Sequence, residues 1–409
     1  MSVADASTTP APASGLRIRA RWLRIEVFAG LVTALALIPE TISFSIVAGV
    51  GPEVGLFTSV IFLLSISVVG ARPAMVSAAA GSIALVVAPL VAEHGVEYLI
   101  VAVILGGVLQ IVLSWVGVAK LMRFVPNSVL TGFVNALAIL IFSAQIPHLV
   151  GVPWLVYPLV AVGLLIMVVL PRVTTALPGP LVATALLTIV AVVFALGVPR
   201  VGDEGEISSS LPSPTLPGVP MSIETLRIVL PYALALALVG LLETLITQRI
   251  VDGLTGTSSS PLREGQGQGI SNVVTGFFGG MGGCAMIGQT MMNVKACGGR
   301  SRLSTVTAAL ALLCLIVFFS STLRAIPMAA LVAVMVVVSF TTMDWKSISP
   351  RTLRAAPLAD STGMLTTIAV TLATGNLAYG VLAGVLCALV IRRVRRGRPV
   401  STAVRPAGE

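Results

Sequence analysis

Two glutamates lie inside long apolar runs of the chain, where an ionised side chain is costly. Glu40 falls within the first such run and Glu243 within the eighth. A carboxylate at the depth of a membrane usually lines an aqueous pathway or pairs with a partner. Four positions after the glutamates come Phe44 and Thr247, on the same helical faces. The spacing predicts two helix faces that line one cavity. The alternative is that a glutamate packs as a hydrogen-bonded structural group.

Glycine-rich stretches precede two short apolar runs, 74–91 and 284–296. Residues 70–73 read Gly-Ala-Arg-Pro, and residues 279–283 read Gly-Gly-Met-Gly-Gly. Each Gly costs about 1 kcal/mol relative to Ala in a helix, and bare amides in hydrocarbon are costly too. We therefore predict extended segments, each leading into a half-helix that begins near the middle of the membrane.

Two half-helices that face one another would aim free N–H groups and positive dipole ends at one point. Such a point is an anion site that needs no basic side chain. A glycine-rich packing seam between ordinary helices is the alternative interpretation.

The composition indicates a polytopic membrane protein. The chain has 409 residues, of which 56% are hydrophobic and only 10% charged, whereas soluble proteins average about 25% charged residues. So few charges cannot cover a soluble body of this size, which argues against soluble enzymes, nucleic-acid binders and secreted scaffolds. The net charge of +9 is then explained by basic loops on the cytoplasmic side, with no nucleic acid as partner.

Fourteen apolar runs are candidate membrane spans, several of them short. They cover residues 25–49, 53–70, 74–91, 96–118, 126–147, 154–171, 179–197, 226–250, 267–281, 284–296, 302–323, 326–341, 360–374 and 377–391.

The distribution of basic residues supports this number of spans. Fourteen spans place both termini on one side, and every Lys and Arg except Arg200, Arg227 and Arg324 falls on that side. Basic loops face the cytoplasm, so we expect a multi-pass protein of the cell membrane with both termini cytoplasmic. The expected domains are a disordered N-terminal tail, a transmembrane domain and a C-terminal tail, over residues 1–24, 25–395 and 396–409.

Weak internal similarity predicts an inverted repeat. Residues 74–77 read Ala-Met-Val-Ser and residues 285–288 read Ala-Met-Ile-Gly, at the starts of the third and tenth spans. Glu40 and Glu243 form a second match at nearly the same offset. Seven spans per unit would give the two units opposite topology. We expect an all-α membrane fold with repeats at about 25–197 and 223–391.

Catalytic and metal-binding patterns are absent from the sequence. The four cysteines lack ligand spacing, and no Walker motif, HExxH motif or serine elbow occurs. We therefore expect no enzymatic activity, no metal site and no cofactor.

Several stretches of the chain resemble the SulP sulfate-permease family of anion transporters, which includes mammalian pendrin and prestin. The resemblance covers about residues 25–395 and is strongest in a Gly-Gln-Gly-Ile-Ser-Asn motif. The stretches that carry it are residues 36–45, 51–57, 240–257 and 267–272, together with Gly279-Gly280 and Gln289-Thr290-x-x-Asn293.

The resemblance implies a seven-plus-seven fold in which a core domain moves against a gate domain, and a homodimer. The core would hold spans 1–4 and 8–11, and the gate spans 5–7 and 12–14. Substrate would lie between half-helices 3 and 10. Carried over position by position, the substrate-binding residues are Glu40, Phe44, Ala80, Gly81, Glu243, Thr247, Gly288 and Gln289.

Three departures from the family pattern matter. Many members have Arg where Gln289 stands, and Glu40 replaces the usual Gln. Members also usually carry a C-terminal STAS domain, which the residues after Arg396 are too few to form. Two carboxylates without a fixed cation would repel an anion unless H⁺ or Na⁺ accompanies it. We therefore expect symport, with Glu40, Glu243 and Thr247 as coupling-ion residues.

The expected function is secondary active transport of a small inorganic anion, sulfate or bicarbonate, by alternating access. The expected partners are that anion, membrane lipids and a second copy of the chain. A nucleobase or dicarboxylate permease of the same fold and an anion channel or exchanger are the alternatives. Gln289, in place of a second acid in half-helix 10, disfavours the nucleobase permease.

Overall fold

The protein is almost entirely helical. The computed structural model describes residues 15–117, 125–173, 178–207, 211–214, 216–220, 222–355 and 357–396. The helices of the first half are α1 (Gly15–Ala48), α2 (Pro52–Val69), α3 (Gly81–His94), α4 (Val96–Val116), α6 (Asn127–Ser143), α7 (Val156–Val173) and α8 (Gly179–Val193), with 3₁₀ turns η2 (Ile146–Leu149) and η3 (Val201–Asp203).

The second half continues in the same manner. Its helices are α9 (Ile223–Thr255), α10 (Pro261–Phe277), α11 (Ile287–Met291), the π-helical turn η4 (Met292–Ala296), α12 (Arg302–Arg324), α13 (Met328–Thr342), α14 (Pro350–Ala355), α15 (Leu358–Thr374) and α16 (Leu377–Arg396). Within the described ranges there are two strands, β1 (Ser77–Ala79) and β2 (Gly283–Ala285).

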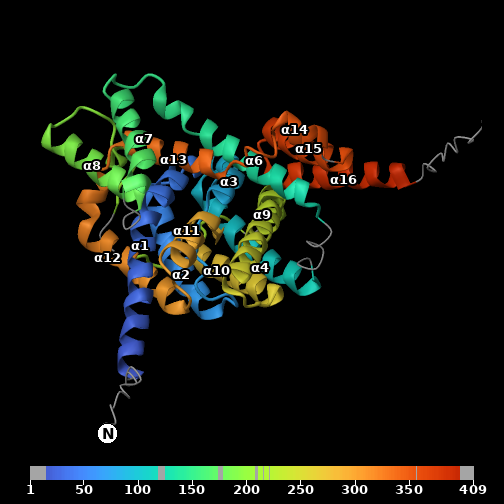
Figure 1. Cartoon of the computed structure of the whole chain (residues 1–409), viewed down its shortest axis with the longest axis horizontal. Coiled ribbons are helices and arrows are strands. Elements are labelled where there is room, and N and C mark those ends of the chain that lie inside the picture. Colours follow the sequence, from blue (N-terminus) through green and yellow to red (C-terminus); the bar gives the residue numbers. More distant parts are fainter. Residues whose placement is uncertain are drawn as a thin grey trace, which may run out of the picture.

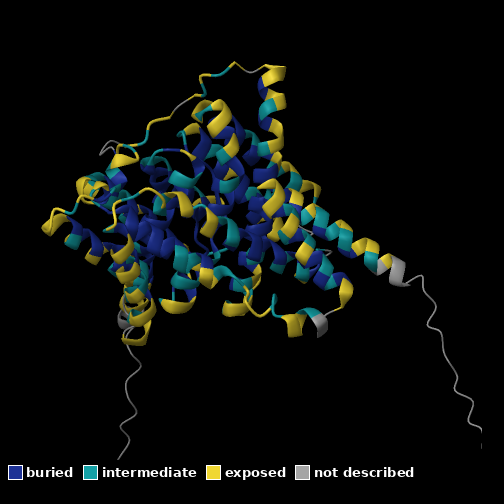
Figure 2. Ribbon diagram, turned by 90° about the horizontal axis from the view of Figure 1, so that it is seen from above, coloured by how far each residue is buried: buried dark blue, intermediate teal, exposed yellow. Residues whose placement is uncertain are grey.

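The helices have the length and surface of membrane-spanning segments. Seven described helices are long and apolar enough to cross a membrane, and shorter apolar helices such as α3, α8 and α13 accompany them. Large apolar side chains cover the outside, including Trp115, which is 78% exposed, and Phe318, which is 75% exposed. Buried residues fill the middle of the molecule (Figure 2). An apolar exterior over a packed interior fits a multi-pass membrane protein.

The predicted N-terminal tail is wrong for residues 15–24. The first helix begins at Gly15, so these residues form its first turns. After Gly15 the stretch contains only helix-compatible residues, with Arg alternating with Leu, Ile, Ala and Trp. The rest of that expected tail, residues 1–14, and residues 397–409 of the C-terminal tail lie outside the described residues.

The helices divide into two groups in space. The first, here called the core group, contains α1–α4 and α9–α12, in which α10 packs on α4 and α1 packs on α12. The second, the gate group, contains α6–α8, α13, α15 and α16, in which α15 packs on α6 and α16. In Figure 1 the labelled helices α7, α13, α14 and α15 lie along the upper edge, above α2, α10 and α4. The groups touch where α1 meets α8 and α13, where α3 meets α6 and where α9 meets α16.

Helices α4 and α10 of the core group approach one another closely through two glycines. A Cβ added to Gly107 would lie 2.6 Å from the carbonyl oxygen of Gly269, and a Cβ on Gly269 would lie 2.6 Å from the carbonyl oxygen of Gly107. Small residues at such crossings let two backbones touch. The Gly-Gln-Gly motif of α10 therefore has a packing role.

We expect Gly269→Ala to destabilise the protein, because the new methyl group would overlap backbone atoms of α4. Overpacking of this kind costs about 1–3 kcal/mol. The readout is the thermal unfolding midpoint of the detergent-solubilised protein. Gly253→Ala is the matched control, since an added Cβ there meets no atom within 4 Å. Equal midpoints for the two variants would contradict the α4–α10 contact.

Candidate functional site

Two extended segments cross inside the core group. Strands β1 and β2 pair antiparallel, with Ala78 opposite Cys284 at the centre. In the glycine-rich stretch before β2, Gly282 has φ +81°, a conformation that side chains rarely adopt. Helix α3 begins directly after β1, and α11 begins directly after β2 and continues into η4. The predicted order of an extended segment followed by a helix is confirmed for both segments. The predicted bounds are wrong, because the strands extend into the runs 74–91 and 284–296 and the helices begin only at Gly81 and Ile287.

Side chains from neighbouring helices satisfy the backbone of the segment around β2. The N–H of Met281 donates to Thr58 Oγ1 at 3.0 Å, and the N–H of Gly283 donates to Asn272 Oδ1 at 2.9 Å. Thr244 Oγ1 accepts from the N–H of Ala285 at 3.3 Å. These partners replace the water that an apolar environment lacks.

The segment around β1 is held in the same way. Ser59 Oγ accepts from the N–H of Ala79 at 3.2 Å, and Thr290 Oγ1 accepts from the N–H of Val76 at 3.0 Å. Asn293 Nδ2 donates to the carbonyl oxygen of Ala74 at 2.9 Å. We call each strand, with the chain before it and the helix after it, a broken segment. Thr290 and Asn293 belong to the second broken segment, in α11 and η4, so each broken segment helps to hold the other.

The start of the first broken segment is tied to the end of α9. Arg72 forms an ion pair with Asp252 at 3.0 Å and donates to the hydroxyls of Thr255 and Thr257. The Asp-Gly-x-Thr-Gly stretch therefore anchors the chain before β1, away from the cavity described next.

The first turns of α3 and α11 open onto a cavity of about 380 Å³. The core group contributes a wall with polar groups and helix N-termini. That wall consists of Ala36, Glu40, Phe44, Ala80, Gly81, Ser82, Glu243, Ile246, Met286, Ile287, Gly288, Gln289 and Met292. The gate group contributes a mainly apolar wall, formed by Phe133, Val134, Leu137, Ile141, Met167, Pro171, Gly179, Pro180, Val337, Val338, Thr341 and Thr342.

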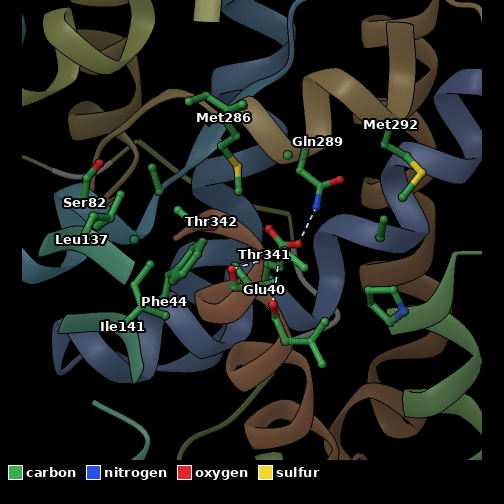
Figure 3. Close-up of a pocket in the computed structure, with 18 of the residues that line it drawn as sticks. Glu40, Phe44, Ser82, Leu137, Ile141, Met286, Gln289, Met292, Thr341 and Thr342 are labelled. Carbon is green, nitrogen blue, oxygen red and sulfur yellow. Dashed lines mark hydrogen bonds between the residues drawn. The ribbon is translucent and has the colours of Figure 1, made fainter. Parts of the chain in front are cut away.

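Glu40 is connected to the second broken segment. Its Oε1 accepts a hydrogen bond of 2.7 Å from Nε2 of Gln289, which projects from the first turn of α11 (Figure 3). Both side chains are buried, with Glu40 8% and Gln289 3% exposed. Pro39 precedes this glutamate inside α1 and removes one helical N–H donor there.

Glu243 is connected to the other broken segment. Its Oε2 accepts from the hydroxyl of Ser82 in the first turn of α3 and from the thiol of Cys284, at 3.2 Å, in β2. Each glutamate of the cavity thus comes from a continuous helix and is bound by a residue in the first turn of a helix that follows an extended strand.

Two glycines shape the cavity in different ways. An added Cβ on Gly81 would lie 2.6 Å from the ring of Phe44, so the ring packs directly on the backbone of α3. An added Cβ on Gly288 would meet no atom within 4 Å, so this backbone faces open space.

The structure brings together seven of the eight residues predicted for the site. Thr247 is outside the lining: it is buried, and its hydroxyl donates to the carbonyl oxygens of Glu243 and Ala285 at 2.8 and 3.3 Å. The sequence analysis missed Ser82, although it directly follows the predicted Ala80 and Gly81. It also missed the gate wall, whose apolar residues resemble those of any other spanning helix.

An all-helical membrane protein with two broken segments meeting at a cavity has the architecture of a membrane transporter. Comparison with known proteins identifies the family. The model of the sulfate permease family matches residues 23–158 and 152–358. The chain therefore belongs to the sulfate permease family, whose members are anion transporters and not enzymes.

Individual relatives agree with this assignment. The chain is 53% identical to the putative sulfate transporter YbaR of Bacillus subtilis over 368 residues, covering 90% of this chain and 76% of that protein. The solved transmembrane domain of the cyanobacterial bicarbonate transporter BicA superposes with a TM-score of 0.77 at 25% identity, covering 90% of this chain and 98% of that one. The murine anion transporter Slc26a9 shares the fold, with a TM-score of 0.78 at 17% identity over 96% of this chain and 74% of that one.

We expect Gly288→Leu to block transport while leaving the fold intact, because an added Cβ there meets no protein atom within 4 Å and the side chain would occupy the cavity. Uptake of labelled sulfate and bicarbonate into proteoliposomes should fall by at least about tenfold, which corresponds to about 1.4 kcal/mol. Gly253→Leu is the matched control, since Gly253 also faces open space but lies outside the lining. Wild-type uptake by Gly288→Leu would exclude this surface from the substrate path.

Proposed function

We propose that this protein is a secondary active transporter that moves a small inorganic anion, of the sulfate or bicarbonate class, by alternating access. The observation that carries the proposal is the convergence of two helix N-termini on one cavity, at Gly81 and at Ile287. The first N–H groups of a helix have no carbonyl partner within it. They bind anions through hydrogen bonds and the positive end of the helix dipole.

The chemistry of the lining favours a small anion recognised by backbone groups. Among the described residues, the lining contains no Lys, Arg or His. A sulfate or bicarbonate ion would therefore bind through N–H groups and the side-chain amide of Gln289. The names of the relatives, a sulfate transporter and a bicarbonate transporter, support the same class.

The charge of the cavity supports coupling to H⁺ or Na⁺. Glu40 and Glu243 both face it and both are 8% exposed. An anion entering between two ionised carboxylates would be repelled. Uptake of a cation with the anion removes this repulsion, and we therefore propose symport.

Alternating access would use the contact between the core and gate groups. The gate wall at the cavity is mainly apolar, with Leu137, Ile141 and Val337 facing the polar wall of the core group. Apolar surfaces can slide without breaking hydrogen bonds. We propose that the core group carries the anion and moves against this wall.

The proposed membrane topology has fourteen spans in two inverted units of seven, with both termini in the cytoplasm. The antiparallel pairing of β1 with β2 supports the inverted repeat, because it relates the two broken segments by a local two-fold axis at Ala78 and Cys284. The proposed location is the plasma membrane, and the proposed assembly is a homodimer.

Counterflow into proteoliposomes tests the proposed function. Labelled sulfate, bicarbonate, fumarate and uracil are offered separately, with and without gradients of Na⁺ and pH. Exchange of sulfate or bicarbonate that saturates and accumulates against a gradient is the expected result. Exchange of uracil or fumarate alone would instead indicate a nucleobase or dicarboxylate permease, and flux without saturation or accumulation would indicate a channel.

We expect Glu243→Gln to reduce gradient-driven anion uptake by at least about tenfold, or about 1.4 kcal/mol. The variant keeps the size of the side chain and an acceptor for Ser82, but it loses the charge that would attract a coupled cation. Glu204→Gln is the matched control, because Glu204 is an exposed carboxylate outside the cavity. Undiminished uptake by Glu243→Gln would remove Glu243 from the mechanism.

A further inference from the structure

In the side-chain amide of Gln289, the nitrogen has a hydrogen-bond partner and the oxygen has none among the described residues. Its Nε2 donates to Glu40 Oε1 at 2.7 Å, whereas its Oε1 is buried without a hydrogen-bond donor among the described residues. In Figure 3 the amide oxygen points away from Glu40. A buried acceptor without a donor loses the hydrogen bonds that water would give it. An orphaned polar atom in the wall of a binding cavity indicates that a ligand completes the arrangement.

A proton on Glu40 would supply the missing donor. An ionised carboxylate only accepts hydrogen bonds, but a protonated one has an O–H group that donates. If the amide of Gln289 turns over about its terminal torsion, Oε1 accepts from this O–H. The same turn moves Nε2 to the position that Oε1 occupies now. Both states of the glutamate can therefore be bound by Gln289, with opposite ends of its amide.

We propose that Glu40 binds the coupled proton and that Gln289 transmits its protonation to the anion site by turning its amide. When Glu40 is ionised, Nε2 of Gln289 is held by the carboxylate and Oε1 presents negative charge to an anion. When Glu40 is protonated, Oε1 binds the acid and Nε2 is free to donate to the anion. This inference rests on the proposed function and specifies the coupled ion and its residue.

The charges around the cavity fit a proton at this position. Glu243 on α9 is the other charged side chain in the lining. The elements that pack against α1 carry further charged side chains at positions outside the lining. These are Glu53 on α2, Glu93 and His94 on α3, Lys295 on η4, and Arg302 and Arg324 on α12.

Because these side chains lie outside the lining, no cation in it offsets the two carboxylates. One proton on Glu40 removes one of the two negative charges as the anion enters.

Glu40 is better suited to exchange a proton than Glu243. The carboxylate of Glu243 accepts from Ser82 and Cys284, two donors that stabilise its ionised form. The bond that Glu40 receives comes from an amide, which can either donate or accept. The amide hydrogen that faces Glu40 also disfavours Na⁺ there, because a cation is repelled by an N–H group.

The proton balance is simple. Water on the side of uptake delivers a proton, which forms the O–H bond of Glu40. After the core group has moved, the same bond breaks and the proton leaves to water on the other side together with the anion. No electron is transferred, and the Glu40 carboxylate is regenerated.

The first test uses proteoliposomes with labelled sulfate and, in parallel, labelled bicarbonate. At zero membrane potential, coupling to one proton drives about tenfold accumulation of a monovalent anion per pH unit of inward gradient. Wild type and Glu204→Gln should respond to the gradient. Glu40→Gln, which resembles the protonated acid, should show equal uptake rates with and without it. A wild-type response to the gradient in Glu40→Gln would overturn the proposal, as would a wild type that responds to Na⁺ but not to pH.

A second measurement does not depend on transport. Infrared difference spectra of the reconstituted protein between acidic and alkaline buffer should contain a carboxylic-acid band together with a band from a side-chain amide. Glu40→Gln should lose both bands, and Gln289→Met should lose only the amide band. Persistence of both bands in Glu40→Gln would overturn the proposal. Absence of counterflow of every tested anion in wild type, with these bands present, would instead refute the proposed function.

Discussion

The need to pair every backbone polar group away from water governs this structure. Two chain segments are extended in the middle of the core group, where unpaired amides would be costly. They are stabilised by pairing with one another and by side chains such as Thr58, Asn272 and Thr244. These polar residues on α2, α9 and α10 therefore stabilise the extended backbone and do not themselves line the cavity. Because those bonds fix the extended segments, the N-termini of α3 and α11 are also fixed at the cavity.

The two glutamates join this architecture to the chemistry of the site. Glu243 links α9 to the start of α3 through Ser82, and Glu40 links α1 to the start of α11 through Gln289. Each carboxylate thus occupies a donor close to the place where an anion would bind. The charge on a glutamate and the donors left for the anion are consequently interdependent. The gate wall, being mainly apolar, contributes shape and exclusion of water to the same cavity.

The sequence predicted the parts of the fold that depend on strong physical costs. Apolar runs located the spanning helices, and the Gly279–Gly283 stretch located a broken segment, because neither lipid nor a helix tolerates such a run. Glu40 and Glu243 were found since buried charge is rare. The gate wall was not found, because residues such as Leu137 and Val337 look alike whether they face lipid, protein or substrate. Thr247 was placed correctly one turn from Glu243, but its hydroxyl donates to the carbonyl oxygen of Glu243 in its own helix and to that of Ala285 in β2. The second bond depends on where β2 lies, which the sequence does not show.

The contact of α4 with α10 has a mechanical consequence. At Gly107 and Gly269 the two backbones meet without any intervening side chain, and one helix comes from each half of the chain. Side chains that interdigitate can change rotamer and absorb a small shear, but two abutting backbones have no such freedom. The contact between α4 and α10 therefore favours movement of the two halves of the core group as one rigid body. In the proposed alternating access, a large displacement would therefore fall at the boundary between the core and gate groups and not between the two halves of the core.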